Sequence, residues 1–454
     1  MSGKAFFDIV STQFMERTLI KDLKAQVGET ALIKGSVSVR RDQGKMVFFD
    51  FRDMTGSVQG VALPKEELAI AVAKELRAEY VVEVSGIVNK RPEKNVNPDV
   101  MNGDIELEIK AITILAKAEI PFELEASVNI DTYLDHQPYT LRSQRSKDIF
   151  KLQETLIQTF RDALRSEGFT EFQAPALVGG DAEGGAAAFE VDYYYNKKAY
   201  LATSPQFYKQ IMVGAFERAF TTPKVFRGEK HATTRHLSEY SSLDFEMGFI
   251  KDHTDVMALL ERVMHRIVHQ LKENHADMFA RFQTELPLLT SKIPVLKLRE
   301  AQKILGVAEE PDLEPEHERA ICEWAKKEHK SDFVYITHYP VSKRPFYTYE
   351  DEADPGFTKS FDLLFRGLEI TTGGQRIHDL SELVKRIESR GLDPQLFAFY
   401  LETFAVGMPP HGGSATGLER LTARMLNLPN VKEATLFPRD LNRIDVLLST
   451  DEKE

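Results

Sequence analysis

The chain of 454 residues contains almost no cysteine and no long hydrophobic run. Cys322 is the only cysteine, which excludes an intramolecular disulfide and a cysteine-rich zinc site and is typical of a cytosolic protein. No apolar stretch approaches the roughly 20 residues that cross a bilayer, so we expect no membrane partner. The N-terminus lacks the apolar core and small-residue cleavage site of a secretory signal. These absences predict a cytoplasmic globular protein.

Positive charge is also in short supply, because the formal net charge is −12. This excess of acidic residues argues against nucleic-acid binding, which requires lysine and arginine at the phosphates. Only the local field at the contact surface decides such binding, however, so one basic segment on an acidic protein would suffice. The hydrophobic fraction of 42% is enough for a full core, and the length accommodates two or three domains.

Residues 28–117 are predicted to form short β-strands around one helix. Near-alternating β-branched and aromatic residues indicate strands at 31–40, 46–52, 57–62 and 80–88, and a helical pattern spans 64–77. Five short strands with one intervening helix fit an oligonucleotide-binding (OB) barrel, although many small barrels give a similar pattern. Basic side chains are concentrated in this segment, at Lys34, Arg40, Arg41, Lys45 and Arg52. They would supply the local basic surface that the whole chain lacks.

A strongly amphipathic helix is predicted after a connector at 118–137. Its apolar face comprises Ile149, Leu152, Leu156, Phe160, Ala163 and Leu164. Gly168 is a plausible end, and Pro175 lies in the extended stretch that follows. The pattern alone fits either a core helix packed on its own sheet or a helix at a subunit interface.

Two arginine-bearing segments carry the strongest signal for function. Phe226-Arg227-Gly228-Glu229 leads through a polar loop into an alternating strand, 242–249, whose polar positions include Asp244 and Glu246. The second segment is Gly417-Leu418-Glu419-Arg420. Each places a planar guanidinium, which binds phosphate or carboxylate in a bidentate manner, among groups suited to a nucleotide.

These segments resemble motifs 2 and 3 of class II aminoacyl-tRNA synthetases, and further stretches resemble the aspartyl enzymes. The further stretches are Glu183-Gly-Gly, Ser204-Pro-Gln-Phe-Tyr-Lys209, the run 361–379 that includes Gly-Gln-Arg-Ile-His-Asp, and Leu436-Phe-Pro-Arg-Asp. The resemblance extends from about residue 15 to 442, and the amphipathic helix with Pro175 is similar to motif 1. The spacing between motifs 2 and 3 leaves no room for the large extra domain of the usual bacterial form, so the chain is similar to the archaeal type.

The resemblance implies an α+β protein. An N-terminal OB-fold anticodon-binding domain (1–117) would be joined by a hinge (118–137) to a class II catalytic domain (138–454), an antiparallel sheet flanked by helices. The expected activity is ATP-dependent activation of L-aspartate and its transfer to tRNA(Asp) by a homodimer. Mg²⁺ would be the cofactor and ATP a substrate.

Individual roles follow from the same resemblance. Arg227 and Arg420 would be catalytic, contacting the α- and γ-phosphates. Residues expected to bind aspartate are Glu183, Gln206, Lys209, Arg227, Asp244, Thr372 and Arg376. Residues expected to bind ATP are Arg227, Glu229, Arg235, His236, Leu237, Glu369, Ile370, Gly417 and Arg420. Asp362, Glu369 and Thr372 would hold the metal, and Arg40, Phe48 and Gln59 would read the anticodon.

Two of these assignments also make sense in elementary chemistry. A lysine and an arginine converging on one side-chain carboxylate would select aspartate over asparagine, because a neutral amide leaves both cations uncompensated. Magnesium prefers one or two carboxylates together with phosphate oxygens and water, so Asp362 and Glu369 would suffice. Thr372 stands where relatives frequently have serine, and the hydroxyl is retained.

Some choices stay open at the level of sequence. Ser414, Ala415 and Thr416 depart from the usual motif 3, which keeps a catalytically silent tRNA-binding paralogue as an alternative. Asparaginyl-tRNA synthetase is the nearest enzyme alternative. Charging of tRNA(Asn) as well as tRNA(Asp) is undecided; Ser38, small where strict enzymes carry a bulky aromatic residue, favours the nondiscriminating form.

Overall fold

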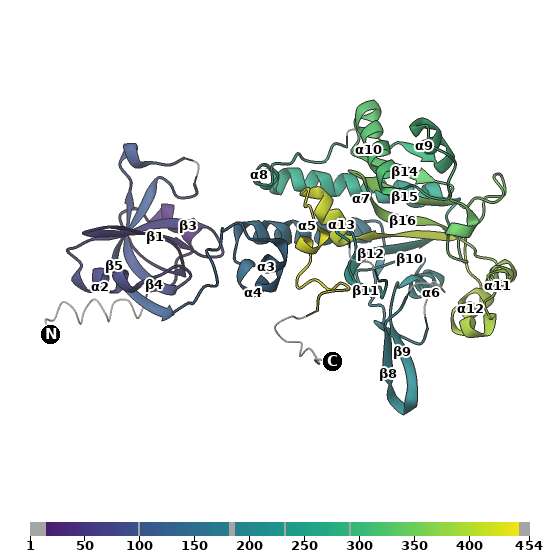
Figure 1. Ribbon diagram of the computed structural model, residues 1–454, viewed down its shortest axis with the longest axis horizontal. Coiled ribbons are helices and arrows are strands. Elements are labelled where there is room, and N and C mark those ends of the chain that lie inside the picture. The colour runs from purple at the N-terminus through teal and green to yellow at the C-terminus, as the bar shows by residue number, and fades with distance from the viewer. Residues whose placement is uncertain (1–14, 99, 181–186, 231–232, 290–291, 445–454) are drawn as a thin grey trace. The chain divides into compact units, whose positions relative to one another are not determined.

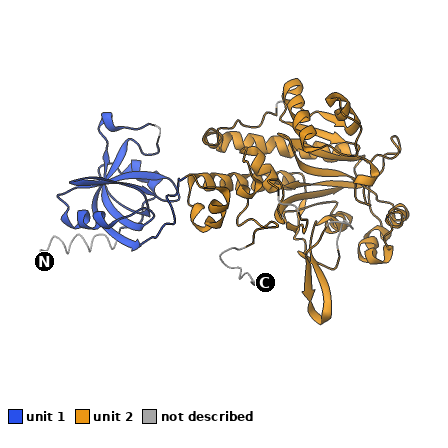
Figure 2. Cartoon of the chain, viewed as in Figure 1, with its two compact units in different colours: residues 1–126 blue, residues 127–454 orange. Residues whose placement is uncertain are grey.

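The computed structural model describes residues 15–98, 100–180, 187–230, 233–289 and 292–444. The chain divides into two compact units, 1–126 and 127–454 (Figure 2). The division falls inside the predicted connector. Within that connector, residues 130–135 form a short helix, which begins where the Asn129 side chain accepts a hydrogen bond from the backbone N–H of Thr132.

The first unit is a closed five-stranded barrel with strand order β1-β2-β3-β5-β4 (Figure 1). Its elements are η1 (Ile20–Gln26), β1 (Thr30–Gln43), β2 (Met46–Arg52), β3 (Ser57–Ala62), α2 (Glu67–Glu75), β4 (Val81–Lys90), η2 (Glu93–Asn95) and β5 (Ile105–Ala116). Alternate residues of each strand point inward, so Val47, Phe49 and Phe51 of β2 are buried in the barrel core. The predicted OB-type barrel, with one helix between its third and fourth strands, is confirmed.

The second unit is built around a large mixed sheet. Among the described residues, nine strands belong to it, in the order β13-β14-β15-β16-β17-β12-β10-β6, with β11 paired to β12. Their bounds are β6 (Thr170–Glu171), β10 (Arg218–Thr221), β11 (Lys224–Phe226), β12 (Glu239–Gly248), β13 (Val295–Lys297), β14 (Phe333–Thr337), β15 (Ser360–Phe365), β16 (Leu368–Arg376) and β17 (His411–Gly417). The pairs β13–β14 and β10–β6, at the two edges, are parallel and the others are antiparallel. The predicted antiparallel sheet is therefore confirmed for its centre.

The second unit also contains helices, several of which flank the sheet (Figure 1). They are α3 (Ile130–Asp135), α4 (Gln137–Thr140), α5 (Gln144–Ser166), α6 (Gln206–Phe216), α7 (His253–Asn274), α8 (Ala276–Arg281), α9 (Leu298–Leu305), α10 (Pro315–His329), α11 (Leu380–Ser389), α12 (Ala398–Ala405) and α13 (Leu418–Met425), with 3₁₀ turns η3 (Tyr194–Asn196), η4 (Val341–Lys343), η5 (Pro394–Phe397) and η6 (Val431–Ala434). A separate three-stranded sheet, β7 (Leu177–Val178), β9 (Lys197–Leu201) and β8 (Glu190–Tyr193), includes the hairpin that projects from this unit. None of the described helices is both long enough and apolar enough to cross a bilayer.

The predicted amphipathic helix is α5, and its apolar face is the one read from the sequence. Ile149, Leu152, Leu156, Phe160, Ala163 and Leu164 are all buried in the largest core cluster of this unit. The helix begins at Ser143, whose hydroxyl accepts a hydrogen bond from the backbone N–H of Ser146. Helices α7 and α13 pack against α5, so one core joins motif 1, the sheet and motif 3.

Truncating this face should destabilise the catalytic unit. Leu156→Ala removes a fully buried side chain and should lower the free energy of unfolding by about 2–5 kcal/mol, measured from the urea midpoint by circular dichroism. Glu154→Ala, at an exposed position of the same helix, should change it by less than about 0.5 kcal/mol. Equal midpoints for Leu156→Ala and the unaltered protein would contradict this account of the core.

Candidate active site

A cleft of about 440 Å³ lies in the second unit, and most of the predicted site residues line it. These are Gln206, Arg227, Glu229, Arg235, His236, Leu237, Glu369, Ile370, Thr372, Arg376, Gly417 and Arg420. They come from α6, the β11–β12 hairpin, β16 and the β17–α13 junction, which are far apart in the sequence. The fold therefore brings motifs 2 and 3 and the Gly-Gln-Arg run into one concave surface.

The predicted motif 2 hairpin forms one wall of the cleft. Strands β11 and β12 pair antiparallel, and the loop 227–238 joins them. The backbone N–H of Arg227 donates to the carbonyl of Ser238 (2.8 Å), which closes the base of the loop. The C-terminal segment also binds the loop, since the N–H of Val431 donates to Thr234 and that of Ser238 to Arg439. Two sequence-distant segments thus position the loop residues at the cleft.

The acidic positions of β12 are buried, not solvated. Asp244 and Glu246 are fully buried, and Lys209 of α6 lies between them with Nζ 2.9 Å from Asp244 Oδ2 and 3.4 Å from Glu246 Oε2. Arg376 Nε donates to Glu246 Oε1 (2.9 Å), and its Nη2 donates to the Gly413 carbonyl (3.1 Å). Burial opposes ionisation, but Arg376 and Lys209 hold the pKa of Glu246 below its ordinary value. We call Lys209, Asp244, Glu246 and Arg376 the charge cluster.

The predicted aspartate-binding residues lie at two depths relative to the cleft surface. Arg376 and Gln206 line the cleft, whereas Lys209 and Asp244 lie beneath its floor with no exposed side-chain surface. Lys209 and Arg376 do converge on one carboxylate, and in this structure it is Glu246. Sequence reasoning placed Glu246 on the polar face of the strand but gave it no role. Glu183 lies outside the described residues.

Strand β17 passes close over this cluster because it carries glycine. Gly413 pairs with Glu246 in the β12–β17 register. A Cβ at Gly413 would lie 2.1 Å from the Phe245 carbonyl oxygen and 2.2 Å from Glu246 Oε2, which no real side chain tolerates. The glycines of this segment are therefore explained by the approach of one strand to a buried carboxylate.

The two candidate metal carboxylates lie on adjacent strands. Asp362 on β15 pairs with Thr372 on β16, and the Thr372 hydroxyl donates to Glu369 Oε1 (2.9 Å). Burial, with a smaller contribution from Glu369, raises the pKa of Asp362 to about 6 despite the opposing effect of Arg344. Asp362 Oδ1 is buried and accepts no hydrogen bond from the described residues. An orphaned oxygen beside a second carboxylate and a hydroxyl fits the donor chemistry that Mg²⁺ prefers.

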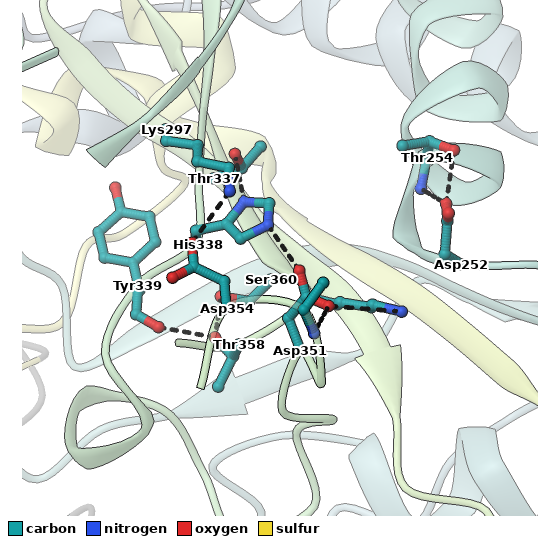
Figure 3. A network of polar contacts seen from close by, with 12 residues as sticks. Asp252, Thr254, Lys297, Thr337, His338, Tyr339, Asp351, Asp354, Thr358 and Ser360 are labelled. Carbon is teal, nitrogen blue, oxygen red and sulfur yellow. Dashed lines mark hydrogen bonds and ion pairs between the residues drawn. The ribbon is translucent and has the colours of Figure 1, made fainter. Parts of the chain in front are cut away.

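A network of polar contacts supports Asp362. Arg344 Nη2 donates to Asp362 Oδ2 (2.8 Å) and Arg344 Nε donates to the Ser360 hydroxyl (3.1 Å). The Ser360 hydroxyl shares a hydrogen bond with Thr358, which donates to the Tyr339 carbonyl. Figure 3 shows Ser360, Thr358 and Tyr339 beside the pair formed by His338 and Asp351. Arg344 also lines the cleft, with Lys343 and Tyr347; the segment 343–348 carried no recognised motif, so sequence reasoning missed it.

Motif 3 contributes Arg420 and one unusual residue. Arg420 Nη1 donates to the Glu369 carbonyl (3.2 Å) and lies 3.8 Å from Glu369 Oε2. Of the three departures from the usual motif, only Ala415 lines the cleft. Ser414 is fully buried, and the buried Thr416 hydroxyl hydrogen-bonds that of Thr371 (2.6 Å). Two of the substitutions are thus accommodated on the packed side of the sheet.

The residues predicted for the anticodon lie on the barrel. Phe48 is half-buried on the outer face of β2, while its neighbours Phe49 and Phe51 stack in the core with ring centroids 5.4 Å apart. Arg41, cross-strand from Phe48, makes a bidentate pair with Asp50 and reaches Gln59 Oε1 (3.3 Å). Arg40 pairs with Asp42 (2.8 Å), and its Nε is buried without a hydrogen-bond partner among the described residues.

Comparison with known proteins agrees with this architecture. Residues 129–441 match the family described as tRNA synthetases class II (D, K and N), and residues 31–115 match the OB-fold nucleic acid binding domain. The chain is 43% identical to an aspartate–tRNA(Asp/Asn) ligase of Thermus thermophilus, over 94% of this chain and 99% of the relative. It is 38% identical to an aspartate–tRNA(Asp) ligase of Picrophilus torridus, over 94% and 99% respectively.

A solved structure extends this similarity to three dimensions. Asparaginyl-tRNA synthetase from Pyrococcus horikoshii, complexed with asparaginyl-adenylate, superposes with a TM-score of 0.87 at 30% identity, covering 95% of this chain and all of that one. The resemblance inferred from the motifs is therefore confirmed. The chain belongs to the class II tRNA synthetases of the aspartate, lysine and asparagine group and carries an OB-fold nucleic acid binding domain before its catalytic domain.

Proposed function

We propose that this chain is an aspartate–tRNA ligase that activates L-aspartate with ATP and transfers it to tRNA(Asp) and tRNA(Asn). The single observation that carries the proposal is the cleft, where the arginines of motifs 2 and 3, Glu369, Thr372 and Arg376 line one cavity. Relatives of nearly equal length at 38–43% identity that are aspartate–tRNA ligases add support.

The reaction consists of two displacements. A carboxylate oxygen of aspartate attacks the α-phosphorus of ATP in line, and pyrophosphate leaves with the electrons of the broken P–O bond. A ribose hydroxyl at the tRNA end then attacks the carbonyl carbon of the adenylate, and AMP leaves. No protein nucleophile is needed, so positioning and electrostatic stabilisation supply the rate.

We assign the contacts with ATP and Mg²⁺ to individual residues of the cleft and its surroundings. Arg227 holds the α-phosphate and the attacking carboxylate, and Arg420 holds the γ-phosphate. The remaining nucleotide contacts come from Glu229, Arg235, His236, Leu237, Glu369, Ile370 and Gly417. Asp362, Glu369 and Thr372 would hold Mg²⁺, which when bound neutralises charge on the phosphates.

Selection of aspartate depends on the charge cluster. The charges of its two cations and two carboxylates cancel before the substrate binds. Arg376 uses Nε to contact Glu246 and Nη2 to contact the Gly413 carbonyl. Nη1 of this cleft-lining residue is then the donor for the substrate side chain. A carboxylate gains a charge-assisted hydrogen bond there, whereas an amide gains less, and Lys209 strengthens the field from beneath. Gln206, Thr372 and Glu183 complete the proposed aspartate site, and the fully buried Asp244 supports it from beneath the floor.

The barrel would recognise the anticodon through Phe48 as a stacking platform and through Arg40 and Gln59 at base edges. The half-buried, outer position of Phe48 supports this role. Ser38 is small, and its hydroxyl donates to the Asp50 carbonyl (2.7 Å), beside these residues. Such a small side chain leaves room for either anticodon, in line with the aspartate–tRNA(Asp/Asn) relative.

We also propose a homodimer and a cytoplasmic location. The similarity of α5 and Pro175 to motif 1 supports the first, and a role in protein synthesis with one buried, reduced thiol at Cys322 supports the second. The activation experiment also distinguishes two alternatives: an asparaginyl-tRNA synthetase, which is the function of one similar solved structure, and a silent tRNA-binding paralogue.

Amino-acid activation distinguishes these functions directly. ATP–pyrophosphate exchange should proceed with aspartate and not with asparagine or lysine. Arg227→Ala should lower exchange by about 10²–10³-fold or more, because it removes a donor aimed at the reacting phosphate. Met54→Ala, at a highly exposed site on the barrel, is the control and should match the unaltered chain. Exchange with asparagine alone would identify the asparaginyl enzyme, and no exchange at all would favour the silent paralogue.

The anticodon proposal has a separate readout. Phe48→Ala should leave ATP–pyrophosphate exchange unchanged and raise the KM for tRNA(Asp) by about 10-fold or more, since one base–aromatic stack contributes about 1–3 kcal/mol. Met54→Ala is again the control and should not alter the KM for tRNA. Unchanged aminoacylation by Phe48→Ala would remove Phe48 from the interface.

The choice of tRNA is tested by charging purified tRNA(Asp) and tRNA(Asn) side by side. We expect both to accept aspartate, with kcat/KM values within about 10-fold, because Ser38 leaves space where a larger side chain would exclude one anticodon. Substitution of Ser38 by tryptophan should then reduce charging of tRNA(Asn) more than that of tRNA(Asp). Failure of the unaltered enzyme to charge tRNA(Asn) would make it a discriminating enzyme.

A further inference from the structure

Glu318 is a buried carboxylate at the cleft that the proposed mechanism does not use. It lies in the first turns of α10, outside every recognised motif, and is 8% exposed. Its Oε2 accepts a hydrogen bond from Arg235 Nη2 at 2.5 Å, which links the motif 2 loop to a helix 83 positions away. Arg235 itself lines the cleft.

The helix that carries Glu318 is packed firmly against the sheet. Ile321, Cys322 and Ala325 of α10 are buried against β14, and α10 also contacts β15 and β16. Gly367, in the turn between β15 and β16, lies directly under the helix: a Cβ there would lie 2.7 Å from Arg319 Cγ, and its φ of +77° also favours glycine. The Glu318 carboxyl therefore has a rigid support.

Arg235, unlike Glu318, has no packed helix to support it. It belongs to a loop, and its long side chain has several rotatable bonds that must be ordered when a ligand binds. An ion pair that already fixes one end of the guanidinium removes part of that ordering cost. A guanidinium has five N–H donors, so a partner at Nη2 leaves others for an anion in the cleft.

We propose that Glu318 is a positioning residue for nucleotide binding, which holds the Arg235 guanidinium at the cleft wall so that its remaining N–H groups can bind the phosphates of ATP. This inference rests on the proposed function, because it assumes that Arg235 contacts the nucleotide. Glu318 touches neither substrate nor metal in this account and acts through Arg235.

The surroundings of Glu318 make its contribution to ATP binding dependent on pH. Burial raises the pKa of Glu318 to about 7; Arg235 and Arg420 oppose this rise, and Glu369 adds to it. Arg424 and the Cys322 thiol also interact electrostatically with Glu318, and Arg319 is a further charged group near Arg424. As the pH falls through about 7, the carboxyl becomes protonated and Arg235 loses its anionic partner. The advantage that Glu318 gives to ATP binding should therefore be present above pH 7 and lost below it.

The test compares Glu318→Gln with Glu316→Gln in ATP–pyrophosphate exchange by the full-length chain. Glu316 lies on the same helix, and its side chain is highly exposed. Glu318→Gln should raise the KM for ATP about 10-fold while kcat stays within about twofold, since the charge-assisted hydrogen bond acts on binding. The KM for aspartate should not change, and Glu316→Gln should match the unaltered chain.

The pH profile and a double-mutant cycle separate positioning from a purely structural role. The ratio of KM for ATP between Glu318→Gln and the unaltered chain should fall towards one from pH 8 to pH 6; ionisation of ATP itself affects both equally. In an Arg235→Ala background, Glu318→Gln should add no further increase, because the two residues act as one unit.

Three outcomes would overturn the inference. They are an unchanged KM for ATP, a lowered KM, which would mean that Glu318 competes with phosphate for Arg235, and an undiminished effect in the Arg235→Ala background. Absence of exchange by the unaltered chain with aspartate would instead refute the proposed function. In that case, the dissociation constant of ATP, measured by calorimetry for both variants, still tests Glu318.

Discussion

A balanced set of buried charges holds the centre of the catalytic sheet. Lys209, Asp244, Glu246 and Arg376 come from three elements, α6, β12 and β16, and meet under the floor of the cleft. Removing one partner of such a set leaves an uncompensated charge in the interior, which typically costs about 3–5 kcal/mol. The set is therefore stable only when all three elements are in register, and the register also places Arg376 at the cleft surface.

Other features of the site depend on this arrangement. Strand β17 passes over Glu246 without a side chain at Gly413, and α13, which carries Arg420, begins directly after this strand. Strand β16 carries both Arg376 and Glu369, so the residue proposed to select the amino acid and one proposed metal ligand share a rigid support. Burial of these charges excludes water from the charge cluster, which strengthens the electrostatic interactions within it.

A second layer of polar contacts ties the cleft to the periphery of the domain. Arg344 links Asp362 to the Ser360–Thr358–Tyr339 chain of hydrogen bonds, and Glu318 links Arg235 to α10. In both cases a residue of the proposed site receives a partner from a segment with no recognisable motif. Positioning of this kind is distributed over the fold, and the motifs alone give an incomplete account of the site.

The sequence by itself determined the two-part architecture, the barrel, the α5 face and the identity of the motifs, because each depends on local periodicity or on residues that are close together in the chain. The apolar face of α5 and the alternation in β2 are direct consequences of helical and strand geometry, and the structure contains both as expected. The sequence also identified Lys209 and Arg376 as two cations that would bind one carboxylate. Only the tertiary structure decided that they share Glu246, that Lys209 and Asp244 lie below the cleft floor, and that Glu318 and Arg344 complete the site. These outcomes depend on strand register and on contacts between residues up to 205 positions apart, such as that of Lys209 with Ser414, and no local pattern records such contacts.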